Sequence, residues 1–341
     1  MRQIRPDPIT SHRAHQTNHD NLSVKIHRVI RNHEPIIITD SYQTGAQALS
    51  LLEQSLPQPS QKSSYQERNE YEKKKRAILL RVLVPIENHE LALEGERYIG
   101  FLKELYPDIR SFTLPLLVVQ ELHNAWYRYS HGVHMPVLGH KIHPYWGTYA
   151  PTRTEHLELF GTWLHQNKKA FQSSIDVGTG SGILALMLRK AGIRRIHATD
   201  NNPNALESVR RECLRHEHPT PISLHSTDLL VGMPSCDLIV FNPPWIPGAV
   251  HDAFDAALYF DDDIFTRFFD QAHALLPQHG SIVLLFSNIM TLLRPDITHP
   301  IEEELKKGRF QCVQKSQRKI KPKDKTKRTK EKVQVWELKH R

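Results

Sequence analysis

The second half of the chain alternates short apolar runs with amphipathic segments. From residue 173 onward, the predicted strands are 173–178, 195–200, 222–228, 236–242 and 280–288, and the predicted helices between them are 182–192, 204–216 and 263–276. This alternation requires crossover connections and predicts a mostly parallel sheet with helices on its faces. Each apolar run ends in glycine or polar residues. Because ligands of such sheets bind beyond the carboxyl ends of the strands, these residues are the candidate site.

The end of the chain predicts an antiparallel addition to this sheet. Residues 309–315 and 333–339 have the pattern of strands, and the basic segment 315–332 separates them, so we expect a long hairpin loop. From 315 to the end there are twelve Lys and Arg against three Asp and Glu, which accounts for the whole net charge of +8. Such a run is usually a solvated segment, but it also suits contact with phosphates.

The part before residue 145 has a different pattern. Residues 1–23 contain few apolar side chains and are predicted to be disordered. Residues 24–144 are expected to form a smaller α/β domain that recognises the substrate, with an exposed loop or linker at 57–75, where apolar periodicity is missing. Residues 145–341 then form the larger, Rossmann-like domain.

Composition predicts a cytoplasmic protein without a membrane partner. No stretch approaches the roughly 18 consecutive apolar residues of a membrane span. The polar N-terminus has no apolar core of a secretory signal. The three cysteines, Cys213, Cys236 and Cys312, are odd in number and far apart, which favours reduced thiols over disulfides.

The segment DVGTGSG joins the first predicted strand of the large domain to its helix. The glycines at 178, 180 and 182 allow a tight turn and a close approach of the backbone to a ligand. Their GxGxG spacing differs from the GxGxxG of dinucleotide folds, which disfavours an NAD-dependent oxidoreductase. A glycine-rich turn without a ligand is the alternative. The candidate ligand-binding residues here are Asp176, Gly178, Thr179, Gly180 and Gly182.

Two aspartates end the second and third strands. Asp200, followed by Asn201, could accept hydrogen bonds from both hydroxyls of a ribose, or it could cap the next helix. Asp228 could accept a hydrogen bond from an adenine amino group, or it could be a turn residue.

The fourth strand stops at Asn242, Pro243, Pro244 and Trp245. Proline has no N–H for a sheet or a helix, so the chain must leave both here. The Asn242 side-chain oxygen and the Pro243 carbonyl could accept both hydrogens of a planar NH₂ group. Trp245 could stack on a flat substrate, or it could belong to the core or a lid.

Residues 145–341 resemble the class I S-adenosylmethionine-dependent methyltransferases. The resemblance rests on the order of the motifs at the strand ends: a glycine loop, two acidic residues and then Asn-Pro-Pro-aromatic. The NPPW ending is similar to the branch of small-domain methyltransferases that methylate planar nitrogen. That branch includes adenine-N6 and guanine-N2 methyltransferases of nucleic acids and release-factor glutamine methyltransferases. The resemblance implies S-adenosylmethionine as cofactor, bound by the residues named above together with Asn242, and catalysis by residues 242–245.

For the substrate, we expect an exocyclic amino group of RNA or DNA. Trp245, Tyr149, Lys321, Lys323 and Lys325 are the candidate contacts. Two alternatives are a glutamine N5-methyltransferase acting on a protein such as a release factor and, more remotely, a non-catalytic cofactor-binding protein.

No metal site is expected. Asp261, Asp262 and Asp263 directly precede a helix, whose positive end stabilises carboxylates. The histidines show no spacing typical of metal ligands.

Overall fold

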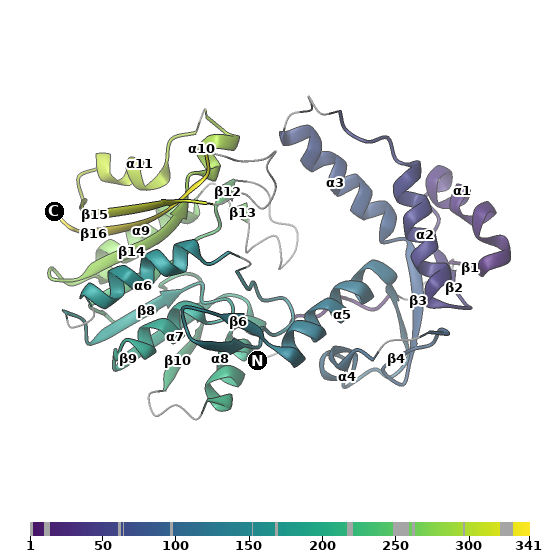
Figure 1. The fold of residues 1–341 in the computed structure, drawn as a ribbon, viewed down its shortest axis with the longest axis horizontal. Helices are drawn as coiled ribbons and strands as arrows, with labels where there is room; N and C mark the ends of the chain where they lie inside the picture. Colours follow the sequence, from purple (N-terminus) through teal and green to yellow (C-terminus); the bar gives the residue numbers. More distant parts are fainter. Residues whose placement is uncertain are drawn as a thin grey trace. The chain divides into compact units, whose positions relative to one another are not determined.

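A computed structural model describes most of the chain. The described residues are 3–9, 14–60, 63, 65–95, 98–151, 153–167, 170–216, 221–247, 259–260, 263–295, 297–320 and 330–341. They form two compact units, Gln3–Arg128 and Tyr129–Arg341 (Figure 1). None of the described helices combines the length and the apolar character needed to cross a bilayer.

The boundary between the units lies earlier than the expected boundary at 144. Helix α5 (Leu116–His131) ends just beyond it, and the short hairpin β6 (Val133–Met135) and β7 (His140–Ile142) follows within the C-terminal unit. The sequence does not signal this boundary, because a continuous helix and a tight hairpin carry the chain past it without a linker.

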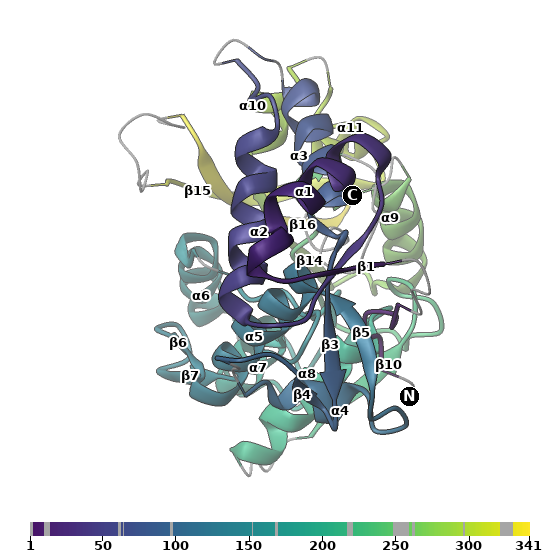
Figure 2. The same ribbon diagram turned by 90° about the vertical axis from the view of Figure 1, so that its right-hand side faces the viewer.

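The N-terminal unit is a small α/β domain (Figure 2). Its sheet has the order β1-β2-β3-β4, with β5 also paired to β3. Its elements are β1 (His15–Thr17), the short helix η1 (His19–Asn21), α1 (Leu22–Asn32), β2 (Ile36–Ile38), α2 (Tyr42–Ser55), α3 (Tyr65–Leu79), β3 (Val82–Glu87), β4 (Glu90–Leu91), α4 (Gly100–Leu105) and β5 (Phe112–Pro115).

Two predictions for this unit are wrong. Within 1–23, β1 pairs in parallel with β2, and the Asn18 side chain accepts the Asn21 N–H in a capping box, so residues 14–23 are ordered. This segment is held in place by main-chain hydrogen bonds and a polar helix cap. Neither interaction requires apolar residues. Within 57–75, α3 begins at Tyr65. Its charged residues are good helix formers, although they leave no apolar stripe.

The C-terminal unit is built on a seven-stranded sheet of order β10-β9-β8-β11-β14-β16-β15. The first five strands are parallel, and β16 and β15 are antiparallel, so the predicted fold class is confirmed. The strands are β8 (Ser173–Val177), β9 (Arg195–Asp200), β10 (Ile222–Ser226), β11 (Leu238–Phe241), β14 (Ser281–Ser287), β15 (Phe310–Lys319) and β16 (Lys332–His340). The short strands β12 (Ile246–Pro247) and β13 (Tyr259–Phe260) pair separately.

Helices cover both faces of this sheet. Alternate residues of β11 face opposite sides, with Leu238 and Val240 in one apolar cluster and Ile239 and Phe241 in the other. The first cluster includes α6 (Glu155–Asn167), α7 (Ile183–Lys190) and α8 (Pro203–Arg215), and the second includes α9 (Ile264–Leu275), α10 (Ile289–Leu293) and α11 (Pro300–Lys306). Burial on both faces explains why the central strands β11 and β14 are almost continuously apolar.

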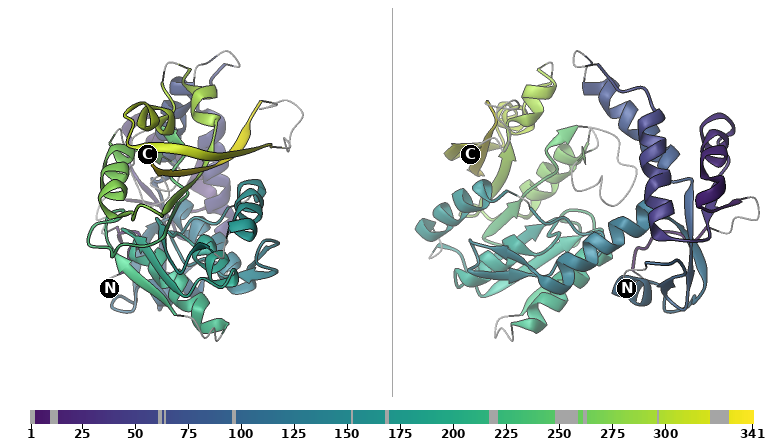
Figure 3. Two further views of the ribbon diagram at one scale, coloured as in Figure 1. Left: turned by 90° about the vertical axis from the view of Figure 1, so that its left-hand side faces the viewer. Right: turned by 45° about the vertical axis from the view of Figure 1, so that its right-hand side comes forward.

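The C-terminal hairpin is longer than the sequence indicated. The twisted pair β15–β16 carries Lys315, Arg318 and Lys319 within a strand, so the basic loop expected at 315–332 is shorter than predicted (Figure 3, left). Lys321, Lys323 and Lys325 lie outside the described residues. β15 is the outer strand of the sheet, and most of its residues are exposed.

A buried carboxylate joins three elements of this unit. Glu337 of β16 is only 6% exposed. It accepts the Trp163 indole N–H from α6 at 2.8 Å and the Ser281 hydroxyl from β14 at 2.8 Å. Both donors are buried, so they depend on this acceptor.

Glu337→Ala is therefore expected to lower the free energy of unfolding by roughly 2–5 kcal/mol, because two buried donors lose their partner. Denaturant unfolding followed by circular dichroism measures the loss. Lys339→Ala in the same strand is the control, with a change of about 0.5 kcal/mol or less. Equal losses for the two variants would contradict the role of Glu337.

Candidate functional site

A cavity opens at the carboxyl ends of the parallel strands in the C-terminal unit. Its volume, counted out to its open mouth, is about 1070 Å³. It lies where β8 and β11 are adjacent and the chain crosses over in opposite directions, which is the usual ligand position of such sheets. The predicted site residues that line it are Tyr149, Gly178, Thr179, Gly180, Asp200, Asn201, Asp228, Asn242 and Pro244.

The glycine loop between β8 and α7 forms one wall. Gly178, Gly180 and Gly182 all have positive φ, which L side chains rarely adopt. Gly182 is the N-cap of α7 and does not line the cavity. A Cβ there would lie 2.7 Å from a Val209 methyl carbon, so this glycine permits close packing of the loop against α8.

Asp176 supports the loop from below and does not line the cavity, which differs from its predicted contact with the cofactor. One carboxylate oxygen accepts the Thr179 hydroxyl at 2.7 Å and the Ala185 N–H at 3.0 Å. Complete burial raises the pKa of Asp176 to about 7, although both hydrogen bonds oppose the shift. Its role in the structure is to hold the loop to the first turn of α7.

Asp200 lies at the end of β9 and lines the cavity. Its two carboxylate oxygens accept the Gly180 N–H at 2.9 Å and the Asn202 N–H at 2.8 Å. Burial raises the pKa of this carboxyl, whereas the N–H groups of Asn202, Gly180 and Asn201 oppose the rise. The alternative of a helix cap does not apply, because Asn202 caps α8 by accepting the Asn204 N–H.

Asp228 follows β10 and also lines the cavity. It is ion-paired with Arg267 of α9, a partner that the sequence did not reveal. The next residue, Leu229, lines the cavity too and has φ +51, a strained conformation for a leucine. Strain of this kind often occurs at functional sites.

Asn242 places an amide at the end of β11, on the cavity wall. Its side-chain oxygen is buried and has no hydrogen-bond partner among the described residues. A buried acceptor without a donor costs about 1–3 kcal/mol, so such groups are rare and call for a functional reason.

Trp245 and Pro243 do not line the cavity. The Trp245 N–H donates to the Leu285 carbonyl oxygen of β14 at 3.3 Å. Its ring packs at 84° to the ring of buried His156, with ring centroids 5.1 Å apart. These contacts anchor the turn that carries Asn242.

Gly147, Thr148 and Tyr149 form another part of the cavity wall, beside the glycine loop: a Cβ at Gly180 would lie 3.6 Å from the Tyr149 carbonyl oxygen. Side chains near and along α8 hold the preceding segment through its backbone. Asn202 donates to the Gly147 carbonyl at 2.8 Å, and Ser208 accepts the Tyr145 N–H at 3.1 Å. Glu212 accepts the His143 N–H at 3.0 Å.

The sequence did not indicate several residues of the cavity. They are Gly147, Thr148, Pro151, Leu157, Ser181, Ile183, Leu184, Asn202, Ala205, Thr227, Leu229, Phe241 and Ile264. Most are small or apolar and occur within ordinary helix and strand patterns. Only Thr227, Ser181 and Asn202, adjacent to predicted site residues, carried a usable signal. Asp261 and Asp262 lie outside the described residues. Asp263 is the N-cap of α9 by position, but its side chain makes no capping hydrogen bond.

Comparison with known families indicates the chemical class of this domain. The model of the methyltransferase small domain family matches residues 158–317. This match covers somewhat less than half of the chain. It supports a methyltransferase domain that uses S-adenosylmethionine as its cofactor.

Curated relatives of this methyltransferase domain have two kinds of substrate in their names. Ribosomal protein L11 methyltransferase of Anoxybacillus flavithermus is 27% identical over 197 residues, covering 52% of this chain and 57% of the relative. The tRNA1(Val) (adenine(37)-N6)-methyltransferase of Edwardsiella ictaluri is 27% identical over 143 residues, covering 40% and 55%. The chain spans little more than half the length of these relatives.

Solved methyltransferase structures are also similar. The ribosomal protein L11 methylase of Lactobacillus delbrueckii subsp. bulgaricus matches with 20% identity and a TM-score of 0.41, covering 57% of this chain and 81% of that one. A putative RNA methyltransferase of Pyrococcus horikoshii matches with 13% identity and a TM-score of 0.41, covering 61% and 91%.

The raised pKa of Asp176 predicts a pH-dependent stability. Between about pH 4 and 7 the folded protein keeps a proton on Asp176 that the unfolded chain has lost, so its stability falls as pH rises. The slope from this group approaches 1.4 kcal/mol per pH unit, to order of magnitude.

Asp176→Asn keeps an acceptor for Thr179 and has no proton to lose. Denaturant unfolding at pH 5, 6, 7 and 8 should show the variant gaining stability relative to the wild type up to about pH 7 and no further gain above it. Parallel curves over this range would contradict the assignment.

Proposed function

We propose that the protein is an S-adenosylmethionine-dependent N-methyltransferase that acts on an exocyclic amino group of a nucleic-acid base. The observation that carries this proposal is the buried, unpartnered oxygen of Asn242 on the cavity wall. An acceptor in this position can form a hydrogen bond with a substrate that has an N–H donor.

The chain's own groups fit the cofactor. The glycine loop, the carboxylate of Asp200, Asn201 and Asp228 line the cavity and would hold it. Gly178 and Gly180, both with positive φ, keep the part of the loop that lines the cavity free of side chains. When bound, S-adenosylmethionine supplies a methyl group on a positively charged sulfur, which is the electrophile.

The Asn-Pro-Pro turn would orient the nucleophile. An amino group conjugated to a ring is a poor nucleophile, because its lone pair is delocalised. The Asn242 oxygen lines the cavity and can accept one N–H bond. Pro243 does not line the cavity, so its carbonyl would accept the second N–H bond only after a local movement of the turn. Two such acceptors would favour a pyramidal nitrogen. These acceptors also stabilise the positive charge that develops on nitrogen during transfer, so no general base is needed before the methyl group moves.

The aromatic contact to the substrate is assigned to Tyr149. It lines the cavity and is 37% exposed, whereas Trp245 is fixed by the Leu285 carbonyl and His156. We therefore propose that Trp245 positions the turn and that a flat base stacks on Tyr149.

Charge favours a nucleic acid as the substrate. The C-terminal segment after 315 is strongly basic, and the curated relatives include a tRNA adenine-N6 methyltransferase. Basic residues would contact phosphates and give a salt-dependent affinity.

A protein substrate is the second candidate. It is favoured by the ribosomal protein L11 methyltransferase of Anoxybacillus flavithermus, which covers 52% of this chain, against 40% for the tRNA enzyme. An amide nitrogen of glutamine is also planar and would meet the same two acceptors.

Asn242→Ala tests the catalytic role. Methyl transfer should fall by roughly 10²–10³-fold, the usual effect of removing one group that stabilises developing charge. Cofactor affinity measured by calorimetry should change little, because other residues provide the main cofactor contacts.

Asn242→Asp keeps an acceptor oxygen and is expected to retain measurable transfer. Unchanged turnover in the alanine variant would refute the role of Asn242. A parallel loss of cofactor binding would instead assign the side chain to the cofactor.

A labelling experiment separates the two substrate classes. The protein is incubated with methyl-labelled cofactor and either total RNA, genomic DNA or nucleic-acid-free protein extract. We expect label on methylated amino groups of nucleosides, measured by mass spectrometry. Label only on protein would replace the nucleic-acid proposal with the second candidate.

A further inference from the structure

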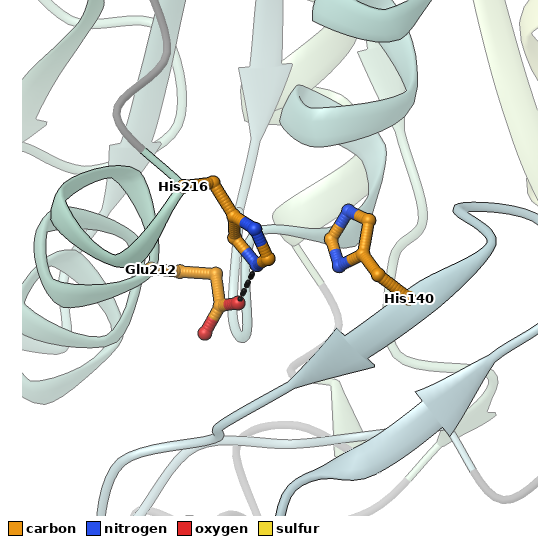
Figure 4. Close-up of side chains that lie close together, drawn as sticks. All are labelled: His140, Glu212 and His216. Atoms are coloured by element: carbon orange, nitrogen blue, oxygen red, sulfur yellow. Dashed lines mark hydrogen bonds and ion pairs between the residues drawn. The ribbon is translucent and has the colours of Figure 1, made fainter.

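Two histidines and a glutamate converge at the end of α8 that is remote from the glycine loop. Figure 4 shows Glu212 from the last turn of α8, His216 from the residue that follows this helix, and His140 from β7 lying close together. One ligand atom from each of the three lies within 4.8 Å of the others. Glu212 is buried and the histidines are partly exposed, so an ion could enter from solvent.

The helix positions two of these groups on one face. Glu212 and His216 are four residues apart, which places their side chains one above the other. The Nε2 of His216 is 2.8 Å from a carboxylate oxygen of Glu212, and the His140 and His216 rings have centroids 4.2 Å apart. The fold thus brings together residues that the sequence alone did not connect.

We propose that His140, Glu212 and His216 bind one divalent transition-metal ion of the Zn²⁺ type. Two imidazoles and one carboxylate form a ligand set that zinc uses, with a fourth position left for water. Mg²⁺ and Ca²⁺ prefer oxygen ligands and are not expected here. This inference does not depend on methyl transfer.

Hydrogen bonds to neighbouring groups hold the proposed ligands in position. The second carboxylate oxygen of Glu212 accepts the His143 N–H at 3.0 Å and lies 3.2 Å from the His143 ring nitrogen Nδ1, so the other oxygen faces His216. The Nδ1 of His140 is 2.8 Å from the Lys141 carbonyl oxygen. A carbonyl can only accept, so Nδ1 donates this hydrogen bond. Figure 4 shows this nitrogen on the side of the ring that faces His216, so it would exchange the hydrogen bond for the metal unless the ring turns to present Nε2. Metal-binding carboxylates and histidines are typically held by such partners.

The distances require only small movements. Ligands of a tetrahedral zinc ion are separated by roughly 3.3 Å, given bonds of about 2.0–2.2 Å. The Glu212 and His216 pair must widen by about half an ångström, and His140 must approach by at most about 1.5 Å. His140 is partly exposed and can turn about its side-chain bonds.

The ion would link the β6–β7 hairpin to α8. Between these elements and the cavity, Ser208 and Asn202 hold the segment that ends at Gly147 and Tyr149. Binding should therefore stabilise the folded C-terminal unit, since an ion that binds only the native state raises its stability.

The test uses the full-length, tag-free protein after treatment with a chelator. Titration with Co²⁺ should give one site per chain with the visible absorption of a tetrahedral nitrogen and oxygen environment, and Zn²⁺ should displace the signal. The melting temperature should rise with Zn²⁺ and stay unchanged with Mg²⁺.

His140→Ala and His216→Ala should each weaken Co²⁺ binding by more than about tenfold while the metal-free proteins melt as folded chains. His143→Ala should weaken it by roughly 10–100-fold, as loss of a supporting group does. His134→Ala, an exposed histidine on the same hairpin, is the matched control and should leave binding unchanged.

Glu212→Ala is less informative, because Glu212 also holds the His143 backbone. Absence of a stoichiometric site in the wild type would overturn the proposal. Equal Co²⁺ affinity in the wild type and both histidine variants would overturn it as well, because the bound ion would then lie elsewhere.

Discussion

The arrangement of the cavity depends on the register between three parallel strands. Val177 of β8 pairs with Phe241 of β11 on one side and with Thr199 of β9 on the other. The residues that follow, Gly178, Asn242 and Asp200, therefore leave the sheet at the same level. A shift of one residue in any of these pairs would turn a strand's core side chains to the opposite face, so burial on both faces protects this alignment.

The same register explains why polar groups can be concentrated there. The Thr179 N–H donates to the Thr199 carbonyl at 2.9 Å, which continues the sheet's hydrogen bonding one step into the loop. Asp176 and Asp200 then bind N–H groups of the loop and of the adjacent turns. Burial raises the pKa of both carboxyl groups, and these hydrogen bonds oppose the rise.

The C-terminal unit could be predicted from the sequence because its central strands β11 and β14 are almost entirely apolar and because Gly, Asp or Asn marks the ends of β8, β9, β11 and β14. The N-terminal unit could not be predicted as well. β1 is ordered by main-chain bonds and α3 by charged helix-forming residues, and neither produces apolar periodicity. For the site, the predictions placed Asp200, Asp228 and Asn242 on the cavity wall. They missed that Asp176 lies beneath the loop and that Trp245 is tied to β14, since the direction of a side chain depends on tertiary packing.

The outer strand β15 also affects how copies of the protein meet. An unpaired strand edge presents N–H and C=O groups that can recruit another strand and start aggregation. Here the edge strand carries Lys315 and Lys319, together with Arg318, which is ion-paired with Glu158, so a second copy approaching edge to edge meets like charge. Salt screens this repulsion over about 10 Å at 0.1 M ionic strength. The solubility of the protein should therefore fall as the salt concentration rises. Proteins whose solubility increases with added salt behave in the opposite way.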